Sequence, residues 1–425
     1  MRPPLKLKAL KGFKDILPGE VEIWQAVEQT ARSVFQRFGF SEIKVPIIEK
    51  TSLFARSIGE TTDIVEKEMY TFEDRNGEMI TLRPEGTASV LRSFIEHSLH
   101  AQKPVQKLFT IGPMFRHERP QKGRLRQFHQ MSVEALGADQ PALDAEIMAM
   151  AWMVLTELKI SASLEINSLG CPACRPDFNA ALLTFLESCK GNLCDDCERR
   201  RQKNPLRVLD CKNPACQEHY VNAPSIIDHL CQGCDDHFNK TESCLKELDI
   251  PYTVNSFMVR GLDYYTKTTF ELLTDQLGAQ SAIAAGGRYD GLIKQLGGPD
   301  LPGIGFAMGM ERLVLLMQQA TEPLAVAGPD LFIAALGESA QKAAFSMSHA
   351  LRINGASVLM DYANRSLKNQ MKQSGNNNCR YTLIIGDDEL SKCQATLRNM
   401  TSGEQEDIAL PGELSAWVEN LRTKF

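Results

Sequence analysis

The sequence contains no apolar run near the roughly 20 residues that a membrane-spanning helix needs. Its basic start, MRPPLKLKALKGFKD, also lacks the apolar region of a secretory signal. The composition, 43% hydrophobic and 24% charged, is typical of a soluble globular protein. These features exclude a protein anchored by spanning helices, and we expect a cytoplasmic location without a membrane partner.

An excess of positive charge is missing as well, because 47 Lys and Arg residues face 53 Asp and Glu residues and the net charge is −6. This excludes a protein that coats nucleic acid by bulk attraction, but phosphate contacts depend on where the cations lie. The stretch FRHERPQKGRLRQFHQ, residues 115–130, concentrates five Lys or Arg residues around one acid, Glu118. The chain therefore has room for a local anion-binding groove.

Cysteines are scarce outside one region: ten of the twelve lie between Cys171 and Cys244. In a reducing compartment, such clustering indicates metal binding before disulfides. Three of the four pairs have a two-residue gap, which lets both thiolates reach one tetrahedral ion, and the gap between Cys211 and Cys216 is wider. The spacing fits two zinc sites of four thiolates, one site with spare thiols, or free thiols in a segment that became cysteine-rich by drift. The pairs are Cys171 and Cys174, Cys194 and Cys197, Cys211 and Cys216, and Cys231 and Cys234. Alternative ligands nearby are His219, His229 and His237.

The chain is too long, at 425 residues, for one ordinary core, so we expect two or three domains. In SEIKVPIIEK, the alternation of Ile43, Val45 and Ile47 predicts a half-buried strand, with Pro46 favouring a sheet edge or an irregularity. Apolar periodicity predicts helices over 19–38 and 88–99 and strands over 79–83, 106–115 and 127–136. The predicted boundaries are 1–170 and 241–320 for a core, 171–240 for a cysteine-rich insertion, 321–329 for a linker and 330–425 for an α/β domain.

Residues 127–136 have two unlike faces, because side chains alternate along a strand. One face is mostly apolar and suits a core; its members are His129, Met131, Val133 and Ala135. The other is mostly polar; its members are Phe128, Gln130, Ser132 and Glu134. The polar face either looks into a cavity or faces solvent. Arg116 and Glu118 in the adjoining loop favour the cavity, since arginine suits phosphate oxygens.

The strands 106–115 and 127–136 and the basic loop between them predict an antiparallel hairpin. It resembles motif 2 of the class II aminoacyl-tRNA synthetases, matched here by Phe115, Arg116, Glu118 and Phe128. PGIGFAMGMERLVLLM, which contains Arg312, is similar to motif 3, and SEIKVPIIEK to motif 1. The segments GFKDILP, LRPEGT, VRGLDYYT and AAGGRYDGL are similar to those of the histidyl-tRNA synthetase family. The resemblance covers nearly the whole chain.

The resemblance implies an α+β fold: a class II antiparallel sheet flanked by helices, with the cysteine-rich insertion and a C-terminal α/β anticodon-binding domain. It implies a homodimer that forms through motif 1. It also implies ATP-dependent ligation of L-histidine to tRNA(His) through a histidyl-adenylate, with Mg²⁺ bridging the phosphates and with AMP and pyrophosphate released. The insertion would contact the acceptor arm of the tRNA. Its structural Zn²⁺ is predicted by the cysteine spacing and not by the resemblance, since the family does not need this metal for catalysis.

The resemblance assigns catalytic roles to three arginines: Arg116 at the α-phosphate and carboxylate, Arg260 at the reacting centre and Arg312 at the γ-phosphate. For Arg312 the alternative is a structural pairing with Glu311 or another acid. ATP would further be held by Glu118, reading the adenine amino group, and by Phe128, stacking on the ring. Glu118 could instead pair with Arg119. Neither His117 nor His129 is assigned as a base.

The remaining implied roles concern the binding of histidine. Its imidazole has two nitrogens, and a selective site would form hydrogen bonds with both. The residues implied for its α-ammonium are Glu85, Gly86, Thr87 and Gln130, and for its imidazole Glu134 and Tyr264. Tyr265 and Tyr289 would line the pocket, although Tyr289 could equally be an ordinary packed tyrosine with its hydroxyl bonded. Gly286 and Gly287 would let the backbone approach the ligand closely, or would mark a bulge.

Two other functions compete with this interpretation. A histidine-sensing regulatory subunit of ATP phosphoribosyltransferase resembles the same core but lacks the C-terminal domain and aminoacylates nothing. The three arginines and the 330–425 domain weigh against it. A generic RNA-binding protein does not explain the polar face that carries Gln130 and Glu134.

Overall fold

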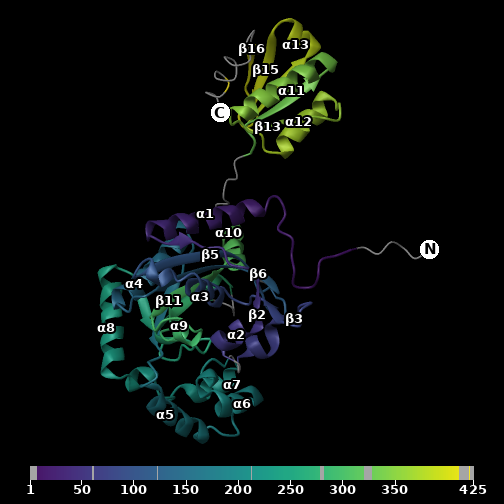
Figure 1. Ribbon diagram of the computed structural model, residues 1–425. Coiled ribbons are helices and arrows are strands. Elements are labelled where there is room, and N and C mark those ends of the chain that lie inside the picture. Colours follow the sequence, from purple (N-terminus) through teal and green to yellow (C-terminus); the bar gives the residue numbers. More distant parts are fainter. Residues whose placement is uncertain are drawn as a thin grey trace, which may run out of the picture. The chain divides into compact units, whose positions relative to one another are not determined.

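The computed structural model describes residues 7–59, 62–121, 123–211, 213–277, 282–319, 328–410 and 421. The chain divides into two compact units, Met1–Leu324 and Ala325–Phe425 (Figure 1). Of the predicted linker, 321–329, all but residues 328 and 329 lie outside the described residues. No helix in the described ranges is long and apolar enough to cross a membrane.

The larger unit is built on an eight-stranded mixed sheet with the order β1-β5-β6-β11-β10-β9-β7-β8. Only the outer pairs β1/β5 and β7/β8 are parallel; the inner strands run antiparallel. The predicted antiparallel hairpin is confirmed, with the predicted bounds for both strands. The strands are β1 Ser41–Glu42, β5 Gln106–Phe115, β6 Gln127–Leu136, β7 Ser163–Ser168, β8 Tyr252–Val254, β9 Thr266–Leu273, β10 Ala282–Arg288 and β11 Gly303–Gly309.

Helices cover the apolar face of this sheet. Met131, Val133 and Ala135 of β6 are fully buried there in the main core, as their alternation predicts. Two of the helices, α4 and α8, lie side by side in Figure 1 and contact each other. The helices that contribute to this core are α1 Val21–Arg37, α4 Pro141–Glu157, α8 Gln232–Glu247 and α10 Met310–Gln319. The opposite face of the sheet is left for polar side chains.

The predicted strand in SEIKVPIIEK is wrong in one respect, because the segment forms two short strands in different sheets. β1 pairs with β5, whereas β2 Ile48–Lys50 joins a small sheet with β3 Tyr70–Glu73 and β4 Met79–Leu82. Pro46 lies in the gap, where it has no N–H to give to a ladder. Ile47, expected on the buried face, is 40% exposed.

The insertion is helical. It leaves the sheet after β7 and returns through α8, so that its predicted boundary at residue 240 falls inside that helix. Phe238 and Leu245 of α8 belong to the main core. Between these points the chain forms a separate small core. Its elements are α5 Arg175–Ser188, α6 Asp195–Lys203, the 3₁₀ turn η3 Pro205–Val208, α7 Pro214–Tyr220 and the 3₁₀ turn η4 Ile226–His229.

The smaller unit has a five-stranded sheet with the order β13-β12-β14-β15-β16, parallel in its first three strands and antiparallel beyond β14. Its elements are β12 Leu331–Leu336, α11 Glu338–Ile353, β13 Val358–Met360, α12 Leu367–Asn376, β14 Tyr381–Gly386, α13 Asp387–Ser391, β15 Gln394–Asn399 and β16 Gln405–Ala409. Buried residues lie on both faces of the sheet. The predicted α/β style of this region is confirmed.

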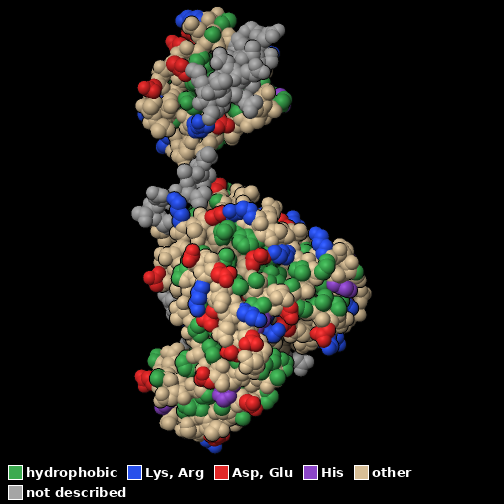
Figure 2. Space-filling model, turned by 90° about the vertical axis from the view of Figure 1, so that its left-hand side faces the viewer, with side chains coloured by type: hydrophobic (Ala, Val, Ile, Leu, Met, Phe, Trp, Pro, Cys, Tyr) green, Lys and Arg blue, Asp and Glu red, His purple; other side chains and the backbone are tan. Residues whose placement is uncertain are grey.

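Charges do not gather by sign on the larger unit in the face that Figure 2 shows, where acidic and basic side chains alternate. This agrees with the absence of a net positive charge in the sequence. A group of arginines instead lines the cavity described next.

Candidate active site

A cavity of about 970 Å³ lies over the polar face of the eight-stranded sheet. It brings together segments from the β5/β6 hairpin, the start of α3 Thr87–Glu96, the strands β9 to β11, the loop before β9 and the insertion. The predicted residues that line it are Glu85, Gly86, Thr87, Arg116, Glu118, Phe128, Gln130, Arg260, Tyr264, Tyr265, Tyr289 and Arg312. Residues predicted from distant parts of the sequence thus share one cavity.

Glu134 lies directly behind the cavity and is only 1% exposed. Its carboxylate accepts a 2.7 Å hydrogen bond from the Thr87 hydroxyl and another from the Tyr289 hydroxyl. Burial raises the pKa of Glu134 to about 8, although both hydroxyl donors oppose the rise. The carboxyl is therefore mostly protonated at neutral pH.

Glu85 has a structural task that its sequence context did not reveal. Its carboxylate accepts hydrogen bonds from the backbone N–H groups of Thr87, at 2.6 Å, and of Ala88, at 2.8 Å. It therefore satisfies the open N-terminus of α3, where a negative charge is stabilised. Burial nevertheless raises the pKa of Glu85. The side chain also lines the cavity, so capping and ligand binding share one carboxylate.

Arg116 is held at the base of the hairpin. Its Nε donates a 2.9 Å hydrogen bond to the Pro84 carbonyl, and its Cζ lies 5.3 Å from the centre of the Phe128 ring. Glu118 forms an ion pair with Arg124, not with Arg119 as the sequence alternative proposed. Arg124 also lines the cavity and is a site residue that sequence reasoning missed.

Arg312 lies in the first turn of α10 and donates a hydrogen bond to the Ala282 carbonyl. Burial lowers the pKa of Arg312, and the nearby positive charge of Arg124 lowers it further. Glu311, its proposed structural partner, accepts hydrogen bonds from the His129 backbone N–H at 2.9 and 3.0 Å. Crowded guanidinium groups in a buried cavity favour a bound polyanion, which relieves their repulsion.

Arg260 forms an ion pair with Glu271 of β9, and its Cζ lies 5.6 Å from the centre of the Tyr265 ring. Glu271 is a second residue that sequence reasoning missed. A signal was present, because Glu271 is the one acid in the strand TKTTFELL, where it lies between apolar residues. Both side chains line the cavity.

Three tyrosines form an aromatic wall beside Glu134. The rings of Tyr264 and Tyr265 lie 4.7 Å apart, and those of Tyr264 and Tyr289 lie 5.8 Å apart at 79°. All three are under 9% exposed. The Tyr289 hydroxyl donates a hydrogen bond to the buried Glu134 carboxylate, a contact that both the pocket-lining role and packing with a bonded hydroxyl would give.

Gly286 and Gly287 fit the bulge alternative better than close approach to a ligand. A Cβ on Gly286 would collide with the backbone of β11 at Gly305, not with the cavity. The pairing of β10 with β9 shifts register between Gly287 and Arg288. Glycine is needed here because the strands lie too close for a side chain.

The insertion contributes a further part of the cavity, through Arg207 among others. One guanidinium N–H of Arg207 donates a 3.1 Å hydrogen bond to the Arg260 carbonyl. Arg200 and Arg207 lie 3.5 and 3.7 Å from the Asp63 carboxylate, respectively. Asn204 donates a 3.1 Å hydrogen bond to Asp263. None of these contacts could be foreseen, because they join the insertion to two distant segments, the loop around Arg260 and the chain at Asp63.

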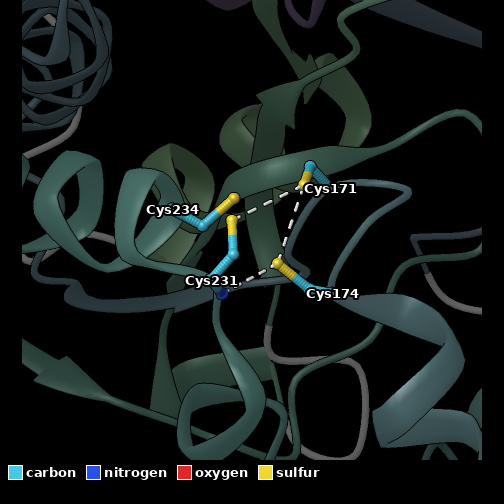
Figure 3. A group of neighbouring side chains, drawn as sticks. All are labelled: Cys171, Cys174, Cys231 and Cys234. Atoms are coloured by element: carbon cyan, nitrogen blue, oxygen red, sulfur yellow. Dashed lines mark hydrogen bonds between the residues drawn. The ribbon is translucent and has the colours of Figure 1, made fainter.

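The cysteine pairs combine into two groups of four, within each of which every sulfur lies within 4.8 Å of the others. One group, shown in Figure 3, contains Cys171, Cys174, Cys231 and Cys234. The other contains Cys194, Cys197, Cys211 and Cys216. Among the described residues no histidine belongs to either group, and His237 instead bonds Asp144 at 2.8 Å. The proposed histidine substitutes are therefore wrong.

Comparison with known proteins decides the family. A model described as histidyl-tRNA synthetase matches residues 12–171 and 219–313. The chain belongs to the histidyl-tRNA synthetase family. A second model, described as an anticodon binding domain, matches residues 330–421. The histidyl-tRNA synthetase match leaves out 172–218, the part of the insertion that contains Cys174, Cys194, Cys197, Cys211 and Cys216.

Relatives in the histidyl-tRNA synthetase family are similar over almost their whole length. The histidine–tRNA ligase of Desulfotalea psychrophila is 58% identical over 96% of this chain and 94% of the relative. That of Syntrophotalea carbinolica is 56% identical over 98% of this chain and 100% of the relative. The apo structure of Staphylococcus aureus histidyl-tRNA synthetase is 37% identical, with a TM-score of 0.82 over 98% of this chain and 100% of that one. These matches support a ligase over the regulatory subunit.

Proposed function

We propose that this chain ligates L-histidine to tRNA(His) in two ATP-dependent steps. The histidine carboxylate attacks the α-phosphate of ATP to give histidyl-adenylate and pyrophosphate, and the terminal ribose hydroxyl of the tRNA then takes the histidyl group and releases AMP. The observation that carries the proposal is that Arg116, Arg260 and Arg312 line one cavity. Both steps develop negative charge on phosphate or carbonyl oxygens, which fixed cations stabilise.

Within this cavity, each arginine has a proposed target. Arg116, anchored on the Pro84 carbonyl, would contact the α-phosphate and the histidine carboxylate. Arg260, positioned by Glu271, would stabilise the reacting centre. Arg312, with Arg124 nearby, would hold the γ-phosphate. The adenine ring would lie against Phe128, with its amino group read at Glu118.

Mg²⁺ would arrive with the ATP and neutralise part of the polyphosphate charge. The cavity fits such an ion, because Glu271 lines it and offers a carboxylate oxygen, the kind of ligand that Mg²⁺ prefers. The chain's own arginines do the remaining work of orienting the phosphates. The metal is thus proposed as part of the substrate complex.

Histidine selection would depend on the buried Glu134 together with Tyr264. A mostly protonated Glu134 can donate to one imidazole nitrogen. An apolar amino acid of similar size would leave this polar pocket unpaired, and such sites discriminate by on the order of 10⁴. Glu85, Gly86, Thr87 and Gln130, which line the cavity, would surround the α-ammonium group, while Tyr265 and Tyr289 complete the wall.

The same proposal includes a homodimer, a cytoplasmic location and structural Zn²⁺ in the insertion, which would contact the tRNA acceptor arm. The dimer is supported by exposed apolar side chains on the small sheet that includes the end of motif 1. Ile48 and Phe72 share one face of that sheet and are 46% and 44% exposed. Neighbouring exposed apolar residues are typical of an association surface.

The test is histidine-dependent exchange between ATP and labelled pyrophosphate, followed by aminoacylation of tRNA(His). We expect exchange with histidine but not with other amino acids, and then transfer to the tRNA. Histidine binding without exchange or transfer would instead identify the regulatory alternative. Exchange with another amino acid would overturn the assignment of the pocket.

A further inference from the structure

We propose that the chain binds two structural zinc ions, one in each four-cysteine group. The group of Cys171, Cys174, Cys231 and Cys234 is here named the neck site, and the group of Cys194, Cys197, Cys211 and Cys216 the tip site. The family match leaves out the residues of the tip site, so the proposal concerns this chain's own insertion.

The sulfur separations are those of a tetrahedral thiolate site. Zinc–sulfur bonds of about 2.3 Å place tetrahedral ligands about 3.8 Å apart. In the neck site, Cys171 lies 3.7 Å from Cys174 and 3.9 Å from Cys231 (Figure 3). In the tip site, Cys194 lies 3.8 Å from Cys211. These sulfurs are not bonded to one another, and all twelve cysteines are free.

Helix N-termini and backbone N–H groups beside both sites favour negatively charged sulfur. Three helices begin at these cysteines: Cys174 is the N-cap of α5, Cys194 of α6 and Cys231 of α8. Helix N-termini favour negative charge. The Cys231 backbone N–H also donates to the Cys174 sulfur at 3.2 Å, and the Cys194 N–H donates to that of Cys216 at 3.2 Å. Such outer bonds orient metal ligands.

The insertion needs a metal because its own core is small. That core has nine buried residues, and three of them are the tip-site cysteines Cys197, Cys211 and Cys216. Small domains with little apolar core usually depend on disulfides or metals. Because these cysteines form no disulfides, a metal is the remaining stabiliser. Four thiolates in a tetrahedron suit zinc or iron, and zinc is the ion of closed structural sites.

The two sites have different tasks because they hold different parts of the chain. The neck site joins two segments of the chain. Cys171 and Cys174 lie in the turn between β7 and α5, and Cys231 and Cys234 lie at the start of α8. These are the points at which the chain leaves and re-enters the core. The neck site therefore fixes the base of the insertion.

The tip site joins α6 to α7 and closes the turn between them. That turn carries Asn204 and Arg207, which bond Asp263 and the Arg260 carbonyl. Cys194 and Cys211 themselves line the active-site cavity. The tip site thus holds the insertion against the loop of a proposed catalytic arginine, a consequence that rests on the proposed function.

The first experiment measures metal in the full chain purified without added zinc. We expect about two zinc ions per chain and no stoichiometric iron. The double variants Cys171→Ser/Cys174→Ser and Cys194→Ser/Cys197→Ser should each keep about one, since the sites are separate. Cys189→Ser, a buried insertion cysteine outside both groups, is the matched control and should keep both. About one zinc ion or less per chain in folded, unaltered protein, or iron in its place, overturns the proposal.

A second measurement does not depend on variants that fold. A mercurial thiol reagent is titrated into the unaltered chain while a chelating dye records zinc release. Release of both ions as eight thiols react supports two four-cysteine sites. Eight thiols that react at once with an ordinary disulfide reagent in the native chain, with no zinc released, overturn them.

The third readout concerns the active site. The tip-site double variant should lower the rate of histidine-dependent pyrophosphate exchange about tenfold, and Cys189→Ser should leave it unchanged. Loss of tip zinc with normal exchange would overturn the coupling to the Arg260 loop. If the unaltered chain showed no exchange, the proposed function would fail while the metal result stood independently.

Discussion

The Thr87 hydroxyl donates a 2.7 Å hydrogen bond to the carboxylate of Glu134, a residue 47 positions further along the chain. The bond joins the first turn of α3 to β6, and the hydroxyl of Tyr289, which directly follows β10, reaches the same carboxylate. The pocket proposed for the imidazole is therefore organised before any ligand binds. Such preorganisation lets a polar site select its ligand without the cost of rearrangement.

Glu134→Ala should mainly damage histidine recognition. It removes the proposed imidazole partner and leaves the Thr87 and Tyr289 hydroxyls unpaired. We expect the KM for histidine to rise about 10- to 100-fold, the usual range for a buried hydrogen-bonding group. The KM for ATP should change little. Pyrophosphate exchange at varied histidine measures both, and an unaltered histidine KM would contradict the assignment.

The pH dependence of stability follows from the same carboxyl. Burial raises the pKa of Glu134 from 4.5 to about 8, so the folded chain holds this proton where the unfolded chain has lost it. Stability should therefore fall as pH rises between these two values, by about 1.4 kcal/mol per pH unit at most. Glu134→Gln has no proton to lose. Its unfolding free energy, measured by urea from pH 5 to 8, should decline less steeply than that of the unaltered chain, and parallel curves would refute the shift.

Much of the site could be predicted because strand period and motif order are local signals. The two faces of β6 differ in the sequence, and the structure puts Met131 and Val133 in the core and Gln130 in the cavity. The resemblance then named residues that do share one cavity. When the two faces of a strand differ in polarity, its own sequence shows which face is buried, even if its neighbouring strands are unknown.

The sequence did not predict which residues distant along the chain would pair with one another. Spacing cannot say that Cys171 joins Cys231 rather than Cys211, because the path of α5 to α8 decides it. Glu118 took Arg124 rather than Arg119 because the hairpin loop folds back on itself. The split of SEIKVPIIEK depends on two different sheets competing for one segment. Such outcomes are set by tertiary packing, which overrides local pattern.

Arg260→Ala should lower the rate of adenylate formation by roughly 10²- to 10³-fold, the usual effect of removing one electrostatic stabiliser. Single-turnover formation of histidyl-adenylate measures this step without the tRNA. Arg260→Lys should recover part of the rate, since it keeps the charge but not the fork that pairs with Glu271. Arg92, which pairs with Glu49 and does not line the cavity, provides the control Arg92→Ala. A loss under about tenfold would remove Arg260 from the reacting centre.

Gly305→Ala tests whether strand packing positions Glu134. Gly305 of β11 lies opposite Glu134 of β6, and an added Cβ would collide with that carboxylate and with the Val133 carbonyl. We expect a loss of about 1–3 kcal/mol in stability, the usual cost of overpacking, together with a raised KM for histidine. The matched control is Gly309→Ala in the same strand, where an added Cβ meets no atom within 4 Å. Its stability should stay within about 0.5 kcal/mol of the unaltered chain. If both variants matched the unaltered chain in urea unfolding and in histidine KM, β11 would not fix the position of the Glu134 carboxylate.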